Sequence, residues 1–362
     1  MSLNGPSTSA SVTSATAGPA PAGSTSACGG RAPAVAMLRL LAGFQVSQAL
    51  YVVARAGVAD VLAAGPRPVA EAASATGVRT DLLRRLVRTL AAEHVFAFDA
   101  DQDTVGLGPL GHTLCSDTDD SLRDVALMWM DTHYAPFAGL WSTLHDGVPA
   151  AERELGKPLF DWIAEEPERV DRFSAAMGNL LALRQDALDS LDLRKVHHLV
   201  DIGGADGTAL AALARRHEWL WGTVFDLPHV VAGAEPVLRA AGVTDRVGTW
   251  GGDFFESVPP GADAYLACFI LHDWNDDQCA VILDRIRRAA GSRARLFLVE
   301  TVVGEGAAPE VAALLDLTMM GMLNGRERSR ADWRSLLSGA GFRLDRVVAT
   351  NGPMCVIEAT SL

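Results

Sequence analysis

The chain has 362 residues, of which 49% are apolar and 21% charged, and its formal net charge is −13. This length allows two or three domains with a large buried core. An acidic balance of this size argues against a chain whose main partner is nucleic acid, because such chains carry a basic face.

The cysteine pattern indicates neither a disulfide framework nor a zinc site. The five cysteines are scattered and never arranged as C-x-x-C: Cys28, Cys115, Cys268, Cys279 and Cys355. Scattered thiols are typical of the reducing cytoplasm. The chain also begins without the basic start and apolar stretch of a secretory signal, so we expect a cytoplasmic protein.

The first segment, residues 1–32, consists mainly of Ser, Thr, Ala, Gly and Pro, which predicts a disordered tail. From Ala34 to about Leu62 apolar residues recur at helical spacing, which predicts two helices, the second ending near Gly65. Polar residues interrupt this apolar stretch, so we expect amphipathic helices and no membrane partner.

Residues 69–107 carry the pattern of a winged helix. A short helix at 69–73, a turn at Gly77 and a basic helix at 81–90 make a helix-turn-helix. Two strands, 95–98 and 104–107, would form the wing. The arginines of this segment leave open a rival function of another class, a winged-helix regulator that binds DNA: Arg79, Arg84, Arg85 and Arg88.

Residues 121–193 show helical spacing throughout, with aromatic and methionine side chains along one side. From Val196 onward strands and helices alternate, which predicts a parallel, doubly wound sheet. Its candidate strands are 198–202, 223–226, 247–250, 264–269 and 295–300, and a terminal hairpin follows at 343–349 and 354–359. We therefore expect the domain boundaries 1–32, 33–116, 117–195 and 196–362.

A glycine turn follows the first of these strands and contains Gly203, Gly204 and Gly207. Glycine lets a ligand lie against bare backbone. Asp226, at the end of the next strand, suits the hydroxyls of a ribose. Asp201 beside the turn disfavours a pyrophosphate but suits the cationic S-adenosylmethionine, which we expect as cofactor. The alternative is a turn that needs glycine only for packing.

Two later segments also follow strands. In Gly252-Asp253-Phe254-Phe255, Asp253 could accept from an adenine amino group and Phe254 could stack on the ring, or they could be a helix cap and a core side chain. His272 ends the fourth strand, where ligands of open α/β sheets bind. A histidine has the pKa to remove a phenolic proton near neutral pH, although a structural role is the alternative.

Two carboxylates are candidates to hold that histidine: Glu300 at the end of the fifth strand, and Glu327 in Gly325-Arg326-Glu327-Arg328. A carboxylate beside an imidazole fixes its tautomer and stabilises the imidazolium. Glu327 could instead pair with a neighbouring arginine at the surface. The acidic run after His272 suits a helix N-terminus better than a metal, so we expect no metal: Asn275, Asp276 and Asp277.

The order of these motifs resembles the S-adenosylmethionine-dependent O-methyltransferases related to plant caffeic acid O-methyltransferase, and most of all their bacterial antibiotic-tailoring branch. The resemblance covers about residues 34–359. It implies a Rossmann-like α/β methyltransferase domain preceded by a helical, winged-helix dimerisation domain. It also implies a homodimer that methylates a hydroxyl of an aromatic small molecule, with residues 117–195 contributing to acceptor binding.

The resemblance assigns roles to individual positions. The catalytic residues are His272 as general base, with Glu300 and Glu327 orienting it. The expected cofactor-binding residues are Asp201, Gly203, Gly204, Asp226, Leu227, Asp253, Phe254 and Cys268. The expected acceptor-binding residues are Trp129, His133, Phe173, Met177, Phe269, Asp273, Met320 and Asn324.

Two positions depart from the family pattern. Ala205 stands where a third glycine is common, and Cys268 replaces a lysine or serine that helps to hold the cofactor. The family also contains members that hydroxylate or decarboxylate their substrates, and the attacked atom could be nitrogen or carbon. These alternatives remain open beside O-methylation.

Overall fold

The computed structural model describes residues 33–306 and 309–362, so the predicted disordered tail at 1–32 lies outside the described residues. The chain then forms three helices where two were predicted: α1 (Pro33–Leu41), α2 (Gly43–Arg55) and α3 (Val58–Leu62). Gly57 separates the last two, with a φ of 69° in the left-handed region that favours glycine.

The winged helix is present. Helices α4 (Val69–Thr76) and α5 (Thr80–Ala91) are followed by strands β2 (Phe96–Asp99) and β3 (Thr104–Leu107). A two-residue strand that the sequence did not indicate, β1 (Arg67–Pro68), pairs with β3 and gives the sheet order β1-β3-β2. One core joins these helices and the wing; among its side chains are Val58, Leu83, Val87, Phe96 and Val105.

The region predicted to be helical, residues 121–193, consists of helices joined by short turns and has no strand. After a 3-10 turn at Gly111–Leu114, they are α6 (Arg123–Thr132), α7 (Tyr134–Phe137), α8 (Leu140–Asp146), α9 (Ala150–Leu155), α10 (Leu159–Ala164), α11 (Pro167–Asn179) and α12 (Leu181–Asp189). Their aromatic and methionine side chains gather in two small apolar clusters, one around Phe137 and Phe160 and one around Met128 and Met177.

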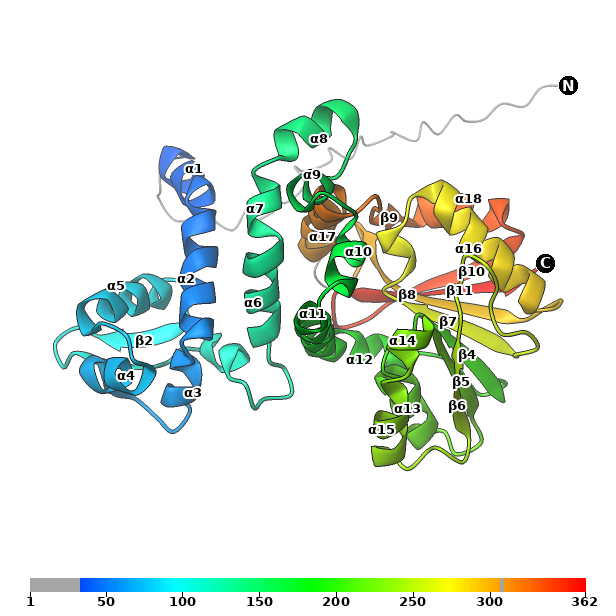
Figure 1. Ribbon diagram of the computed structural model, residues 1–362, viewed down its shortest axis with the longest axis horizontal. Helices are drawn as coiled ribbons and strands as arrows, with labels where there is room; N and C mark the ends of the chain where they lie inside the picture. Colours follow the sequence, from blue (N-terminus) through cyan, green and yellow to red (C-terminus); the bar gives the residue numbers. More distant parts are fainter. Residues whose placement is uncertain (1–32, 307–308) are drawn as a thin grey trace, which may run out of the picture. The chain divides into compact units, whose positions relative to one another are not determined.

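The large sheet is the predicted doubly wound one (Figure 1). Its parallel strands are β4 (His198–Ile202), β5 (Trp221–Asp226), β6 (Val247–Gly251), β7 (Ala264–Cys268) and β8 (Arg295–Val303). The terminal hairpin of β10 (Phe342–Ala349) and β11 (Met354–Ser361) joins β8 antiparallel. The strand order is β10-β11-β8-β7-β4-β5-β6.

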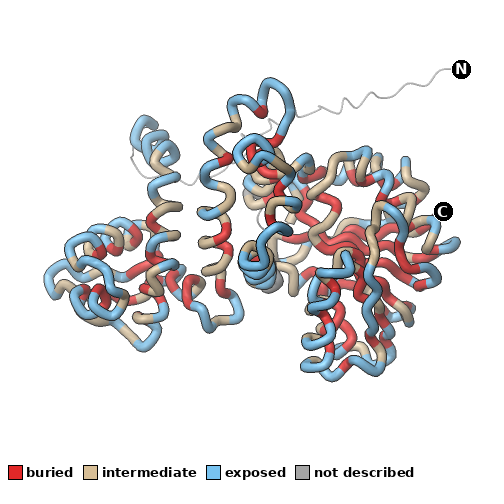
Figure 2. The backbone as a smooth tube through the Cα atoms, in the orientation of Figure 1, coloured by how far each residue is buried: buried red, intermediate tan, exposed pale blue. Residues whose placement is uncertain are grey.

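Helices cover both faces of this sheet, and its inner strands β7, β8 and β11 are the most continuously buried part of the tube in Figure 2, whereas the edge strands β6 and β10 are mostly exposed or half-buried. One face packs against α12, α13 (Thr208–Arg216) and α15 (Ala234–Ala240). The other packs against α16 (Asp276–Ala289) and α18 (Arg330–Gly339). The short α14 (Pro228–Val231) follows β5, and α17 (Pro309–Met322) follows β8.

The strand order places a topological switch between β4 and β7, because the chain winds outward through β5 and β6 and then returns to β7 and β8. Ligands of open α/β sheets bind beyond the carboxyl ends of the strands at such a point. The segments after β4 and β7 are the glycine turn and the His272 loop.

Residues 33–306 and 309–362 contain short helices only, none of 18 or more residues. No single helix there is long and apolar enough to cross a membrane; α1 and α2 meet the test only when taken together, as a bent pair.

Candidate active site

The glycine turn after β4 is held against the end of β5. The backbone N–H groups of Gly203 and Gly204 donate to the carbonyl of Phe225, at 2.8 and 3.2 Å. Ala205 adopts a left-handed φ of 47°, which costs a residue with a Cβ roughly 1–2 kcal/mol. Its N–H donates to Asp226 Oδ2 at 2.9 Å. The departure at Ala205 therefore leaves the turn attached to the carboxylate at the end of β5.

Two unpartnered polar atoms lie near this turn. Asp201 is buried, its Oδ2 has no hydrogen-bond partner among residues 33–306 and 309–362, and burial raises its pKa to about 7. Arg184 on α12 has a buried Nε without a partner, while its Nη2 donates to the Met177 carbonyl at 3.2 Å. Its Nη1 lies 3.8 Å from Cys268 Sγ. A cation thus stands beside the position where Cys268 departs from the family pattern.

Arg184 was missed in the sequence. It lies 84 residues before Cys268 on a helix of weak amphipathicity, and no motif surrounds it. Arg184 lies beside the switch point because α12 packs against the sheet. That packing cannot be inferred from the pattern of residues along the chain.

The other predicted cofactor residues lie after β5 and β6. Asp226 accepts from Ala205 N and, through Oδ1, from Leu227 N at 2.7 Å, and burial raises its pKa. Asp253 Oδ1 accepts from Phe255 N at 2.8 Å within a turn, so it does not cap a helix as the alternative expected. Phe254 packs against the ring of Trp274, with centroids 6.0 Å apart.

His272 lies in a 3-10 turn directly after β7 and is buried. Its Nδ1 is 2.7 Å from Glu327 Oε1, and its Nε2 is 3.4 Å from Asp273 Oδ1. A carboxylate only accepts, so Nδ1 carries a proton toward Glu327. Burial alone would lower the pKa of His272, but Asp273, Glu300 and Glu327 together outweigh it and raise the pKa to about 10.

Glu300 takes a different position from the one expected. Its Oε1 accepts from the backbone N–H groups of Ile270 and Leu271, at 3.2 and 2.9 Å, and within the described residues it makes no hydrogen bond to the His272 ring. Burial raises its pKa to about 7. Glu300 therefore fixes the backbone that carries His272, and Glu327 is the carboxylate that contacts the ring.

The Glu327 loop packs tightly on the His272 turn. The N–H of Arg326 donates to the His272 carbonyl at 2.9 Å. A Cβ on Gly325 would lie 1.9 Å from that same oxygen. Arg328, fully buried, donates from Nη1 to the Leu271 carbonyl and from Nη2 to the Trp274 carbonyl, at 2.9 and 2.8 Å. The surface pairing considered for Glu327 is thus wrong, because this side chain is buried.

The predicted acceptor residues only partly converge. Phe269 packs edge-on against His272 with centroids 4.5 Å apart, and Asp273 adjoins the same ring. Phe173 contacts Phe160, which contacts Trp274 two residues beyond His272. The remaining residues stand in the helical region or near the Glu327 loop: Trp129 and Met177 in one apolar cluster, His133 tilted against Trp129 with ring centroids 6.1 Å apart, Met320 on α17 and the exposed Asn324.

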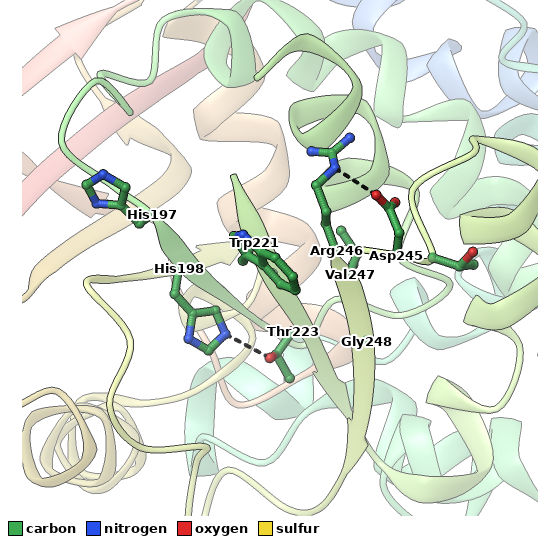
Figure 3. A pocket seen from close by; sticks show the side chains of 10 residues that line it. His197, His198, Trp221, Thr223, Asp245, Arg246, Val247 and Gly248 are labelled. Atoms are coloured by element: carbon green, nitrogen blue, oxygen red, sulfur yellow. Dashed lines mark hydrogen bonds and ion pairs between the residues drawn. The ribbon is translucent and has the colours of Figure 1, made fainter. Parts of the chain in front are cut away.

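A cavity of about 500 Å³ lies elsewhere, at the amino ends of β4, β5 and β6 (Figure 3). Its polar groups already have partners: His198 Nε2 lies 3.0 Å from Thr223 Oγ1, and Arg246 Nη1 lies within hydrogen-bond distance of the carbonyls of Ala214, His217 and Leu220. It is thus separate from the candidate site at the carboxyl ends. In the part of the chain that the structure describes, no three His, Cys, Asp or Glu side chains are arranged so that they could hold a metal ion.

Comparison with known proteins identifies the family. The model of an O-methyltransferase dimerisation domain matches residues 38–117, and that of an O-methyltransferase domain matches residues 140–343. A phenazine O-methyltransferase of Lysobacter antibioticus is 36% identical over 89% of this chain and 95% of its own. An 8-amino-8-demethylriboflavin N,N-dimethyltransferase of Streptomyces davaonensis is 35% identical over 87% and 91%.

A solved structure gives the same picture. An O-methyltransferase from neocarzinostatin biosynthesis, in complex with S-adenosylmethionine and 2-hydroxy-5-methyl naphthoic acid, has a TM-score of 0.75 at 31% identity and covers 90% of this chain and 98% of its own. The chain belongs to the O-methyltransferase family and is an S-adenosylmethionine-dependent enzyme.

The close approach at Gly325 generates a prediction. Gly325→Ala should lower kcat about 10²-fold, because its Cβ must displace the loop that presents Glu327, and displacements of about 1 Å have such costs. The dissociation constant for S-adenosylmethionine, measured by calorimetry, should stay native. Gly339→Ala is the matched control, because a Cβ there meets nothing within 4 Å. A native kcat in Gly325→Ala would contradict the prediction.

Proposed function

We propose that the enzyme transfers a methyl group from S-adenosylmethionine to a hydroxyl of an aromatic small molecule in bacterial natural-product biosynthesis, with His272 as general base. The observation that carries the proposal is the buried pair of His272 and Glu327 at the switch point, 2.7 Å apart. Relatives named as a phenazine O-methyltransferase and a 3-amino-4-hydroxybenzoate 4-O-methyltransferase support an aromatic acceptor.

The geometry assigns a role in the reaction to His272 and to Glu327. Glu327 keeps the proton of the imidazole on Nδ1, which leaves Nε2 as the atom that takes the acceptor's hydroxyl proton. When bound, S-adenosylmethionine supplies an electrophilic methyl group on a sulfonium. His272 Nε2 would take the proton of the acceptor's hydroxyl as that oxygen replaces the sulfur on the transferred methyl group. Alignment of the two reactants supplies much of the acceleration.

The side chains near the glycine turn suit this cofactor. Its methionine part carries an ammonium and a carboxylate, and the two unpartnered atoms, Asp201 Oδ2 and Arg184 Nε, have the matching charges. We assign Arg184 to the carboxylate, in place of the lysine or serine that Cys268 replaces. The other proposed cofactor residues are Gly203, Gly204, Asp226, Leu227, Asp253 and Phe254.

The acceptor should lie between the His272 turn and the helical region. The flat rings and the flexible methionine side chains there suit a planar apolar molecule. The proposed contacts are Trp129, His133, Phe173, Met177, Phe269, Asp273, Met320 and Asn324. Burial lowers the pKa of His133 to about 4, so it would meet the acceptor as a neutral ring.

A nitrogen acceptor is the second candidate, because the N,N-dimethyltransferase relative matches most of the chain.

The DNA-binding alternative has less support. Arg79 pairs with Asp81 at 2.9 Å, and Arg84 makes a two-fold contact with Asp103 at 2.6 Å. Two of the four arginines are therefore engaged within the winged helix.

We also propose a cytoplasmic location, in keeping with free thiols at Cys115, Cys268, Cys279 and Cys355.

The cofactor assignment predicts a binding defect. Asp226→Ala should weaken the binding of S-adenosylmethionine, measured by calorimetry, because it removes the acceptor for the ribose hydroxyls and the anchor of Ala205 N. The exposed Asp245→Ala, in the cavity at the other end of the strands, is the control and should bind normally. Tighter binding of NAD than of S-adenosylmethionine would overturn the assignment.

The base assignment predicts a rate defect. His272→Ala should lower kcat about 10²–10⁴-fold at neutral pH, and the loss should shrink toward the phenol's own pKa of about 10. In the native enzyme kcat/KM should rise with pH through the neutral range, because the raised pKa keeps the ring largely protonated at pH 7. Mass spectrometry of products from phenols, hydroxynaphthoates and arylamines supplies the measurement. Full turnover of His272→Ala with both ligands bound would refute the role.

The dimerisation domain predicts a homodimer. Helix α1 and the start of α2 expose a run of large apolar side chains: Val35, Met37, Leu38, Leu40, Leu41 and Phe44. Exposed apolar area of this kind marks an association surface. Light scattering should give twice the monomer mass of 38.3 kDa, with or without residues 1–30. A monomer across micromolar concentrations would be inconsistent with this expectation.

A further inference from the structure

Glu327 uses both of its carboxylate oxygens in the buried site. Oε1 faces His272 Nδ1 at 2.7 Å, and Oε2 accepts from the hydroxyl of Thr301 at 2.5 Å. The side chain of Glu327 and the whole of Thr301 have no exposed surface. Water therefore does not reach this carboxylate, and its orientation depends on the groups that the protein supplies.

The strand pairing fixes Thr301 in this place. Thr301 lies on β8 opposite Met354 of β11. The next residue of β8, Val302, pairs with Arg328 of the two-residue strand β9 (Arg328–Ser329). This register sets Glu327 beside Thr301, and the N–H of Glu327 also donates to Asp316 Oδ1 at 2.9 Å. Backbone and side chain of Glu327 are thus held from two different elements.

We propose that Thr301 is a positioning residue for the reaction: its hydroxyl anchors Glu327 so that Oε1 holds the His272 ring. The inference rests on the proposed function, in which His272 is the base. Thr301 does not touch the reacting atoms and acts through Glu327. Without the hydroxyl, Oε2 would be a buried acceptor with no partner, and the carboxylate would turn to find one.

Two substitutions distinguish the effect of the Thr301 hydroxyl from the effect of the packing of the Thr301 side chain. Thr301→Val keeps the shape and removes the donor, whereas Thr301→Ser keeps the donor and removes a methyl group. Binding of S-adenosylmethionine and a cooperative unfolding transition report that each variant is folded. Thr301→Ala is a second variant without the hydroxyl should Thr301→Val fail to fold.

The first measurement needs no acceptor. The Nδ1–H proton of His272, held against a carboxylate, gives a far-downfield NMR signal that is assigned by its loss in His272→Ala. In Thr301→Val this signal should move upfield and exchange faster with water, and in Thr301→Ser it should stay near its native position. An unchanged signal in Thr301→Val and Thr301→Ala would overturn the proposal.

The second measurement is kinetic, with a hydroxynaphthoate as the acceptor probe. Thr301→Val should lower kcat about tenfold, part of the 10²–10⁴ available from a general base, and leave KM for S-adenosylmethionine unchanged. In the His272→Ala background it should have no further effect, because the two changes act through one unit. An equal loss in both backgrounds would overturn the proposal. If the NMR signal moves but His272→Ala keeps full turnover, Thr301 positions the ring and the base assignment fails instead.

Discussion

The contact between His272 and Glu327 joins two loops that are 55 residues apart in the chain, and the candidate site depends on it. A buried imidazole is orientated only by its neighbours, because its ring has no solvent to bond with. Glu327 is itself held by Thr301 through one oxygen and by Asp316 through its backbone. The chemistry proposed for His272 therefore depends on groups from β7, β8, α17 and the loop before α18.

Arg328 keeps those two loops together. Its buried guanidinium bonds to carbonyls at both ends of the His272 turn and stacks near Trp333, with 5.3 Å between the Arg328 Cζ and the ring centroid. It also pairs with Asp276 at the start of α16. A buried carbonyl without a hydrogen-bond partner destabilises the folded state. The hydrogen bonds from Arg328 therefore stabilise the packing of the His272 turn against the Glu327 loop. Gly325 allows the approach that brings Arg328 into range.

Much of the fold could be predicted because its strands end at chemically distinct residues. Asp201, Asp226 and His272 stand at or just beyond the carboxyl ends of their strands, where the apolar runs stop. Glu300 was expected at a strand end too, but β8 continues beyond it to Val303. The contacts of Glu300 and the position of Arg184 could not be predicted from the sequence, because the partners of these side chains depend on how distant elements pack together. Strand β9 was missed for a related reason: two residues carry no alternation, and its pairing with β8 depends on tertiary structure. The predicted domain boundaries and site roles stay predictions.

The charges of the site make opposing demands on the proposed reaction. Asp273, Glu300 and Glu327 favour a cation near the switch point, which suits a sulfonium, but the same carboxylates raise the pKa of His272 and keep its proton in place. A general base must lose that proton before the acceptor arrives. A cation bound beside the ring lowers its pKa, since like charges disfavour the protonated form. The carboxylates that attract the cofactor therefore also raise the pKa of His272. The positive charge of the bound cofactor lowers that pKa again and favours the neutral ring that a general base needs.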